Sequence, residues 1–126
     1  MSQPTRQGLR SLLLLMAAGS FLAVHTARAE DDPDAAWVVY KGTDGPGVGK
    51  RIVLISGDEE YRSEEALSQL AKIMAVRNGF KCTVLYAQDP AEPGIVNPQV
   101  LDHIPGLEAL RTADLMVIAT RFRALP

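Results

Sequence analysis

The sequence predicts an α/β protein in which a parallel sheet is covered by helices on both faces, in three layers. Two observations carry this prediction. Short apolar runs rich in β-branched residues occur at intervals, which is typical of strands buried on both faces of a parallel sheet. A segment with helical periodicity separates the first two runs, and such alternation of strand and helix is typical of parallel α/β sheets.

Residues 1–29 have the pattern of a secretory signal peptide. Arg6 and Arg10 precede an apolar run from Leu12 to Val24, and the small residues of Ala27-Arg28-Ala29 suit signal peptidase. We expect cleavage before Glu30 and a secreted or periplasmic protein. The alternative is an uncleaved anchor, but as a helix this run spans only about 20 Å, less than a hydrocarbon core of about 30 Å. We therefore expect no stable membrane anchor after cleavage.

Composition restricts the partners and the chemistry of the chain. The 126 residues carry 13 Lys and Arg against 15 Asp and Glu, and cleavage of the signal peptide would remove Arg6, Arg10 and Arg28 but no Asp or Glu. The remaining acidic chain gives no electrostatic reason to expect a nucleic-acid partner. Cys82 is the only cysteine, so no intramolecular disulfide can form, and we interpret it as a small core residue. His103 has no second histidine at ligand spacing, so no metal site is predicted.

Residues 30–49 read as an acidic and Gly-rich N-terminal extension. Its first part, up to Ala36, is acidic and interrupted by proline, and Trp37 to Tyr40 is either a short edge strand or an apolar lid. The segment from Gly42 to Lys50 superficially resembles a phosphate-binding loop. That pattern needs glycine at position 44 and Ser or Thr at position 51, whereas the chain has Asp44 and Arg51, so we reject nucleotide binding here.

The α/β domain proper is predicted over residues 50–126. Its first strand is Arg51 to Gly57, and the helix after it runs from Ser63 to Asn78, with Ser63 as N-cap and Gly79 as the left-handed residue at its end. The apolar face of this helix is predicted to comprise Leu67, Leu70, Ala71, Ile73 and Met74.

Two further strands complete the predicted sheet. They are Phe80 to Ala87 and Asp114 to Thr120, and between them lie a Pro-rich loop from Gln88 to Pro98 and a short helix from about Pro105 to Arg111. In that short helix, Leu107 and Leu110 are expected to dock on the sheet.

The chain ends directly after the third predicted strand, which we expect to be buried. Leu125-Pro126 is typical of the entry to another helix, because proline is favoured at the first helical position. We therefore expect residues 50–126 to be the N-terminal half of a domain that is incomplete at its C-terminus. The alternative is a small three-stranded domain that a partner completes.

The candidate site lies where strand order is expected to reverse. In open α/β sheets, ligands bind outside the carboxyl ends of the strands at that point. If the order is 2-1-3, as in flavodoxin-like folds, the loop from Gly57 to Ser63 faces Thr120 to Arg123. The alternative is that this charge-rich loop is only a solvated surface. The candidate ligand-binding residues are Gly57, Asp58, Glu59, Tyr61, Arg62, Arg121 and Arg123.

Three segments resemble the start of trehalose-utilisation (ThuA-like) domains, especially those of exported bacterial proteins. They are RIVLISGDEEYRSEE from Arg51, GFKCTVL from Gly79, and PGLEALRTADLMVI from Pro105 followed by TRFR from Thr120. The resemblance covers nearly all of the chain after the signal peptide. It implies a class I glutamine amidotransferase-like fold and a role related to carbohydrates, with a small polar or carbohydrate ligand. In true amidotransferases the nucleophile follows the next strand, beyond Pro126, so catalytic residues and cofactors are not assigned.

Other functional classes remain open at this point. A receiver-type signalling domain also has acidic residues after its first strand, but it needs an aspartate at the end of the third strand, where this chain has Thr120. A hydrolase or amidotransferase-like enzyme acting through downstream groups is a second alternative, and a non-catalytic binding module is a third. The oligomeric state is not predicted.

Overall fold

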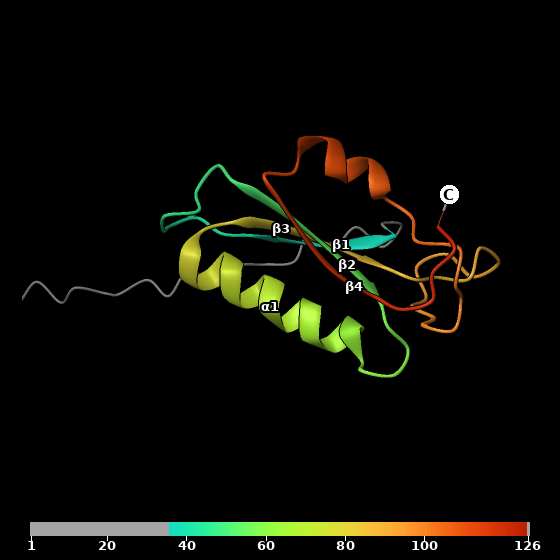
Figure 1. The fold of residues 1–126 in the computed structure, drawn as a ribbon. Coiled ribbons are helices and arrows are strands. Elements are labelled where there is room, and N and C mark those ends of the chain that lie inside the picture. Colours follow the sequence, from blue (N-terminus) through green and yellow to red (C-terminus); the bar gives the residue numbers. More distant parts are fainter. Residues whose placement is uncertain (1–35, 126) are drawn as a thin grey trace, which may run out of the picture.

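The β-branched runs and the helical segment form regular structure in the computed structural model, which describes residues 36–125. They build an open, mixed four-stranded sheet with a long helix on one face and a short 3-10 helix on the other (Figure 1). The predicted signal peptide lies outside the described residues. In chain order the elements are β1 (Trp37–Lys41), β2 (Arg51–Gly57), α1 (Ser63–Asn78), β3 (Lys81–Tyr86), η1 (Leu107–Thr112) and β4 (Leu115–Thr120).

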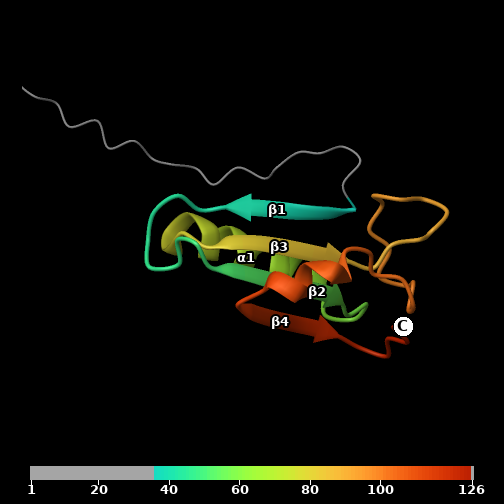
Figure 2. The same ribbon diagram turned by 90° about the horizontal axis from the view of Figure 1, so that it is seen from above.

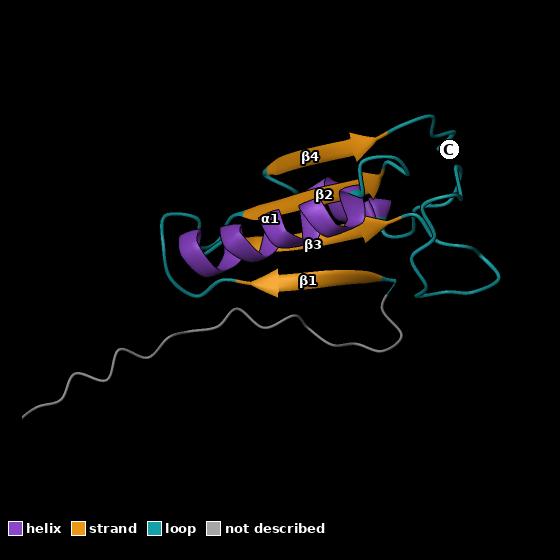
Figure 3. Cartoon of the chain, turned by 90° about the horizontal axis from the view of Figure 1, so that it is seen from below, coloured by secondary structure: helices purple, strands orange, loops and turns teal. Residues whose placement is uncertain are grey.

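The strand order of the sheet is β1-β3-β2-β4 (Figure 2). β2 pairs in parallel with both β3 and β4, so the 2-1-3 order expected for the three predicted strands is confirmed. β1 pairs antiparallel with β3, with Trp37 opposite Leu85, and this makes the sheet mixed rather than purely parallel (Figure 3). Of the two interpretations of Trp37 to Tyr40, the edge strand is the correct one.

β2 is the central strand of the parallel part, and its side chains alternate between two apolar cores. Ile52 and Leu54 face α1 and pack with its inward residues, whereas Val53 and Ile55 face η1. All four are at most 2% exposed. The continuous apolar run in the sequence is therefore explained by burial on both faces, as expected for a strand between two layers.

Helix α1 packs on the sheet through small residues. Ala71 and Ala75 are completely buried and Leu67 nearly so, and Met74 packs at the margin of this core. The prediction that Leu70 and Ile73 belong to the buried face is wrong, because both are exposed beside the inward row. Neither α1 nor η1, the helices of the described part, is long and apolar enough to cross a membrane.

The Gly-rich loop after β1 wraps around the C-terminal end of α1. Gly47 N donates to the Asn78 carbonyl at 2.7 Å, and Gly42 N donates to the Phe80 carbonyl at 3.0 Å. The loop thus supplies a donor to the otherwise unpaired carbonyls at the negative end of the helix dipole. A phosphate-binding loop would lie at the opposite, positive end of a helix.

The elements after β3 differ most from expectation. The predicted short helix is a 3-10 helix, η1, over Leu107–Thr112, and its Leu107 and Leu110 pack on the sheet as predicted. The prediction that β4 is buried is wrong. β4 lies at the edge of the sheet, where α1 covers mainly β2 and β3, and its Leu115, Met116 and Ile118 are about half exposed.

A carboxylate clamp joins the first residues of β2 to the turn before β4. Asp114 accepts a hydrogen bond from the Arg51 backbone N–H at 2.8 Å and pairs with Lys50 Nζ at 3.2 Å. The Arg51 hydrogen bond, followed by that of Lys50, lowers the pKa of Asp114 below its ordinary value of 3.8. A pKa lowered by folding adds stability above the unfolded value and loses that stability as the pH falls through the folded value.

We therefore expect Asp114→Asn to unfold at lower urea concentration than the wild type at about pH 7, and the difference to shrink as the pH falls below 3.8. Asparagine keeps the shape and one acceptor oxygen but loses the charge that Lys50 and the Arg51 N–H favour. Urea titrations of both proteins at about pH 7 and about pH 3 measure this. Equal stability at neutral pH, or a difference that persists in acid, would contradict it.

Candidate functional site

The carboxyl ends of β2 and β4 lie side by side, so the two predicted site segments face each other. Gly57, the last residue of β2, is the register partner of Thr120, the last residue of β4. The Arg121 backbone N–H continues this contact by donating to the Gly57 carbonyl at 3.2 Å. The expected juxtaposition of the loop after β2 with residues 120–123 is therefore confirmed, and every candidate residue lies in this region.

Local hydrogen bonds hold the loop between β2 and α1 in one shape. The hydroxyls of Ser56 and Ser63, both buried, are 2.9 Å apart, and the Asp58 backbone N–H donates to Ser63 Oγ at 2.8 Å. The Asp58 carboxylate accepts from the backbone N–H groups of Glu60 and Tyr61, at 2.9 and 3.1 Å. Asp58 thus closes a turn through its own loop, a common role of aspartate. The side chains of Ser56, Asp58 and Ser63 therefore make their hydrogen bonds within the loop itself.

Ser63 does not cap α1 as predicted. The N-cap residue is Arg62, which has a left-handed φ of 51° and no side-chain cap hydrogen bond. The Ser63 hydroxyl points back to Ser56 and Asp58 instead, because those partners lie in the turn that enters the helix. This hydroxyl fixes the loop to the end of β2 rather than to the first turn of α1.

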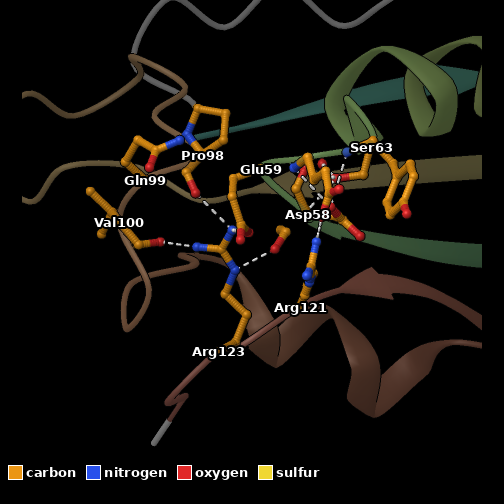
Figure 4. A network of polar contacts seen from close by, with 12 residues as sticks. Asp58, Glu59, Ser63, Pro98, Gln99, Val100, Arg121 and Arg123 are labelled. Atoms are coloured by element: carbon orange, nitrogen blue, oxygen red, sulfur yellow. Dashed lines mark hydrogen bonds and ion pairs between the residues drawn. The ribbon is translucent and has the colours of Figure 1, made fainter.

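Arg123 is the most buried charged side chain at the site, at 3% exposure. Its guanidinium donates to three backbone carbonyls: those of Gly57, Val100 and, at 2.7 Å, Pro98 (Figure 4). It also pairs with the Glu59 carboxylate at 3.3 Å. Arg123 thereby joins the end of β2 to the long loop between β3 and η1. Four of its five N–H donors therefore have protein partners.

The outer rim of the site carries paired charges and exposed aromatic rings. Arg121 pairs with Glu60, and Arg62 pairs with Glu65. The Arg121 guanidinium also lies over the ring of Phe122, 4.7 Å from its centroid, a favourable cation–π arrangement. Tyr61 and Phe122 are 73% and 72% exposed, which is unusual for aromatic side chains of this size.

Residue 122 also determines where the two neighbouring arginines lie. Phe122 has a left-handed φ of 52°, a conformation that non-glycine residues seldom adopt. The turn at this residue separates Arg121, which stays at the rim, from Arg123, which is buried. Such strained backbone is found preferentially at functional sites.

Sequence reasoning missed two parts of the site. The first is Glu60, which forms an ion pair with Arg121. Its position in the acidic run after the first strand could have indicated this pair, because the two loops were expected to face each other. The carbonyls of Pro98 and Val100 had no recognisable signal, because backbone acceptors look alike in any sequence. The long loop is held near the end of β3 by the Gly94 N–H, which donates to the buried Gln88 side chain at 2.9 Å, and by the Asn97 N–H, which donates to the Ala87 carbonyl at 2.8 Å.

The described residues show few groups suited to covalent chemistry. Cys82 is completely buried at the other end of the sheet, and burial raises the pKa of its thiol to about 11, so the thiolate nucleophile is suppressed at neutral pH. Within residues 36–125, no group of three or more His, Cys, Asp or Glu residues could hold a metal ion.

Comparisons with protein-family models, with curated proteins and with solved structures give no match to this chain.

Proposed function

We propose that this chain is an exported ThuA-like α/β domain that binds a small, hydroxyl-rich ligand of the carbohydrate class at the carboxyl ends of β2 and β4. The observation that carries the proposal is the strand order β3-β2-β4, which brings the Gly57–Ser63 loop against residues 120–123. This is the position where open α/β sheets bind ligands. The same order supports the finer assignment to a flavodoxin-like, class I glutamine amidotransferase-like fold.

The chemistry of the rim supports a neutral polar ligand. The Glu60–Arg121 pair offers acceptors and donors whose charges balance, so an ionic ligand gains little over water there. Sugars present many hydroxyls that can both donate and accept, which suits such a mixed set. The exposed rings of Tyr61 and Phe122 provide apolar surface for the carbon faces of a sugar ring.

Binding without catalysis fits the described residues better than hydrolysis. The two serines nearest the strand ends, Ser56 and Ser63, are buried and hydrogen-bonded to each other. A catalytic serine needs an accessible oxygen next to a general base. Binding is therefore the role that we propose for the described residues, and the hydrolase or amidotransferase-like alternative has no specific observation in its favour.

The test is a titration of the ¹⁵N-labelled protein with glucose and trehalose, followed by amide chemical shifts. We expect saturable shifts confined to residues 58–62 and 120–123, and weaker binding in Arg121→Met. Arg111→Met is the matched control, because Arg111 is an exposed arginine at the end of η1, next to the start of β4. Absence of saturable shifts, or equal weakening by both variants, would refute the proposal.

A further inference from the structure

A second hollow lies away from the strand ends just described. It has a volume of about 520 Å³ and lies between β1, the first turns of α1 and the end of β3. Cavities of a few hundred Å³ are the usual size for small-molecule sites. None of the residues that line it belongs to the candidate segments 57–62 and 120–123. The two regions have only helix α1 in common, which begins directly after the first of these segments. Its chemistry can therefore be considered independently of the proposed sugar site.

The polar atoms of this hollow are mainly hydrogen-bond acceptors. The Ser68 hydroxyl donates to the Glu64 backbone carbonyl, which uses its only proton. Ser68 Oγ and Tyr86 Oη are 2.7 Å apart, so Tyr86 must be the donor of that hydrogen bond. Burial raises the pKa of Tyr86, which keeps this phenol protonated at neutral pH. The Tyr86 oxygen can therefore only accept a hydrogen bond from a ligand.

The Glu64 side chain adds an unbalanced negative charge. Its Oε2 atom is buried and has no hydrogen-bond partner among the described residues, whereas the neighbouring Glu65 is paired with Arg62. None of the described residues that line the hollow is Lys or Arg. A buried carboxylate oxygen without a partner is costly, and because Glu64 lines the hollow, a donor bound there can relieve that cost.

We propose that this hollow binds a small organic cation, an alkylammonium group whose N–H donors satisfy Glu64 and the Tyr86 oxygen. Val38 of β1 and Val96 of the long loop form apolar walls that suit the alkyl part. A neutral polyol fits less well, because its hydroxyls need donors as well as acceptors, and the Gln69 amide is the main donor in the lining. The proposal does not depend on sugar binding at the strand ends.

The experiment titrates the purified protein with butylammonium chloride, with 1-pentanol as a neutral probe of similar length. We expect saturable amide shifts around Ser68 and Tyr86 with butylammonium and none with pentanol. Glu64→Gln should weaken binding at least about tenfold, since hydrogen bonds to charged groups are the strong ones. Glu108→Gln is the matched control, because Glu108 is an exposed glutamate on η1, across the sheet, and should leave the affinity unchanged.

Three results would overturn the proposal. They are the absence of saturable binding, equal binding of pentanol, and an unchanged affinity in Glu64→Gln. Tyr86→Phe, which keeps the ring and removes the oxygen, should weaken butylammonium binding a few-fold and gives a second measure if Glu64→Gln folds poorly. The comparison of the two probes uses the wild type alone. Loss of sugar binding in Arg121→Met has no bearing on any of these outcomes.

Discussion

Replacing Arg123 with methionine is expected to lower the free energy of unfolding by about 3 kcal/mol, because it leaves several partly buried acceptors without a donor at once. Methionine fills much of the same volume but cannot bond to the carbonyls of Pro98 and Val100 or to the Glu59 carboxylate. Gly57 keeps one partner, the Arg121 N–H. Urea unfolding followed by circular dichroism measures the loss.

The matched control is Arg121→Met, at an arginine only two residues away. Arg121 is 36% exposed and its ion pair with Glu60 is solvated, so this change should cost less than about 1 kcal/mol. Hydrogen exchange provides a local measure, since the Asn97 N–H bonds to Ala87 and the Val100 N–H bonds to Asn97. Arg123→Met should speed exchange at both amides. Equal costs for the two variants, or unchanged exchange, would show that Arg123 does not hold the long loop.

The parts of the fold that could be predicted are those with a strong period in the sequence. β2 and α1 have the predicted bounds, because the switch from a continuous apolar run to helical spacing occurs sharply at Gly57 to Ser63. The burial of β4 was overestimated for a physical reason. An apolar run such as Leu115 to Thr120 shows that both faces of a strand are apolar, but not whether helices cover them.

The candidate site could be located from the sequence but its internal pairing could not. The position of the site could be predicted from the strand order, because parallel strands place their carboxyl ends at one edge of the sheet. The burial of its individual side chains could not be predicted, because Arg121 and Arg123 look equivalent in the sequence. They differ only through the left-handed turn at Phe122 and the backbone carbonyls of a loop that is distant in the sequence, contacts that no local pattern encodes.

The contact between the Gly-rich loop and the end of α1 gives the second large expected effect. Gly79 ends the helix with a left-handed φ of 79°, and its N–H donates to the Ala75 carbonyl at 3.0 Å. A Cβ atom at this position would lie 2.5 Å from the Asp44 carbonyl oxygen and 2.9 Å from the Val48 side chain. Backbone cannot move aside as a flexible side chain can. Glycine is therefore required at position 79 for both conformation and space.

We expect Gly79→Ala to destabilise the protein by at least about 3 kcal/mol, combining left-handed strain of about 1–2 kcal/mol with an overpacking cost of similar size. Gly49→Ala is the matched control, because Gly49 has a nearly identical φ of 82° but no atom within 4 Å of the point that an added methyl group would occupy. It should lose only the strain component. Urea unfolding of both variants separates the two contributions, since their difference measures the contact of the loop with the helix end. Equal losses in the two proteins would mean that the loop yields easily, and that α1 is ended by the conformation of Gly79 alone.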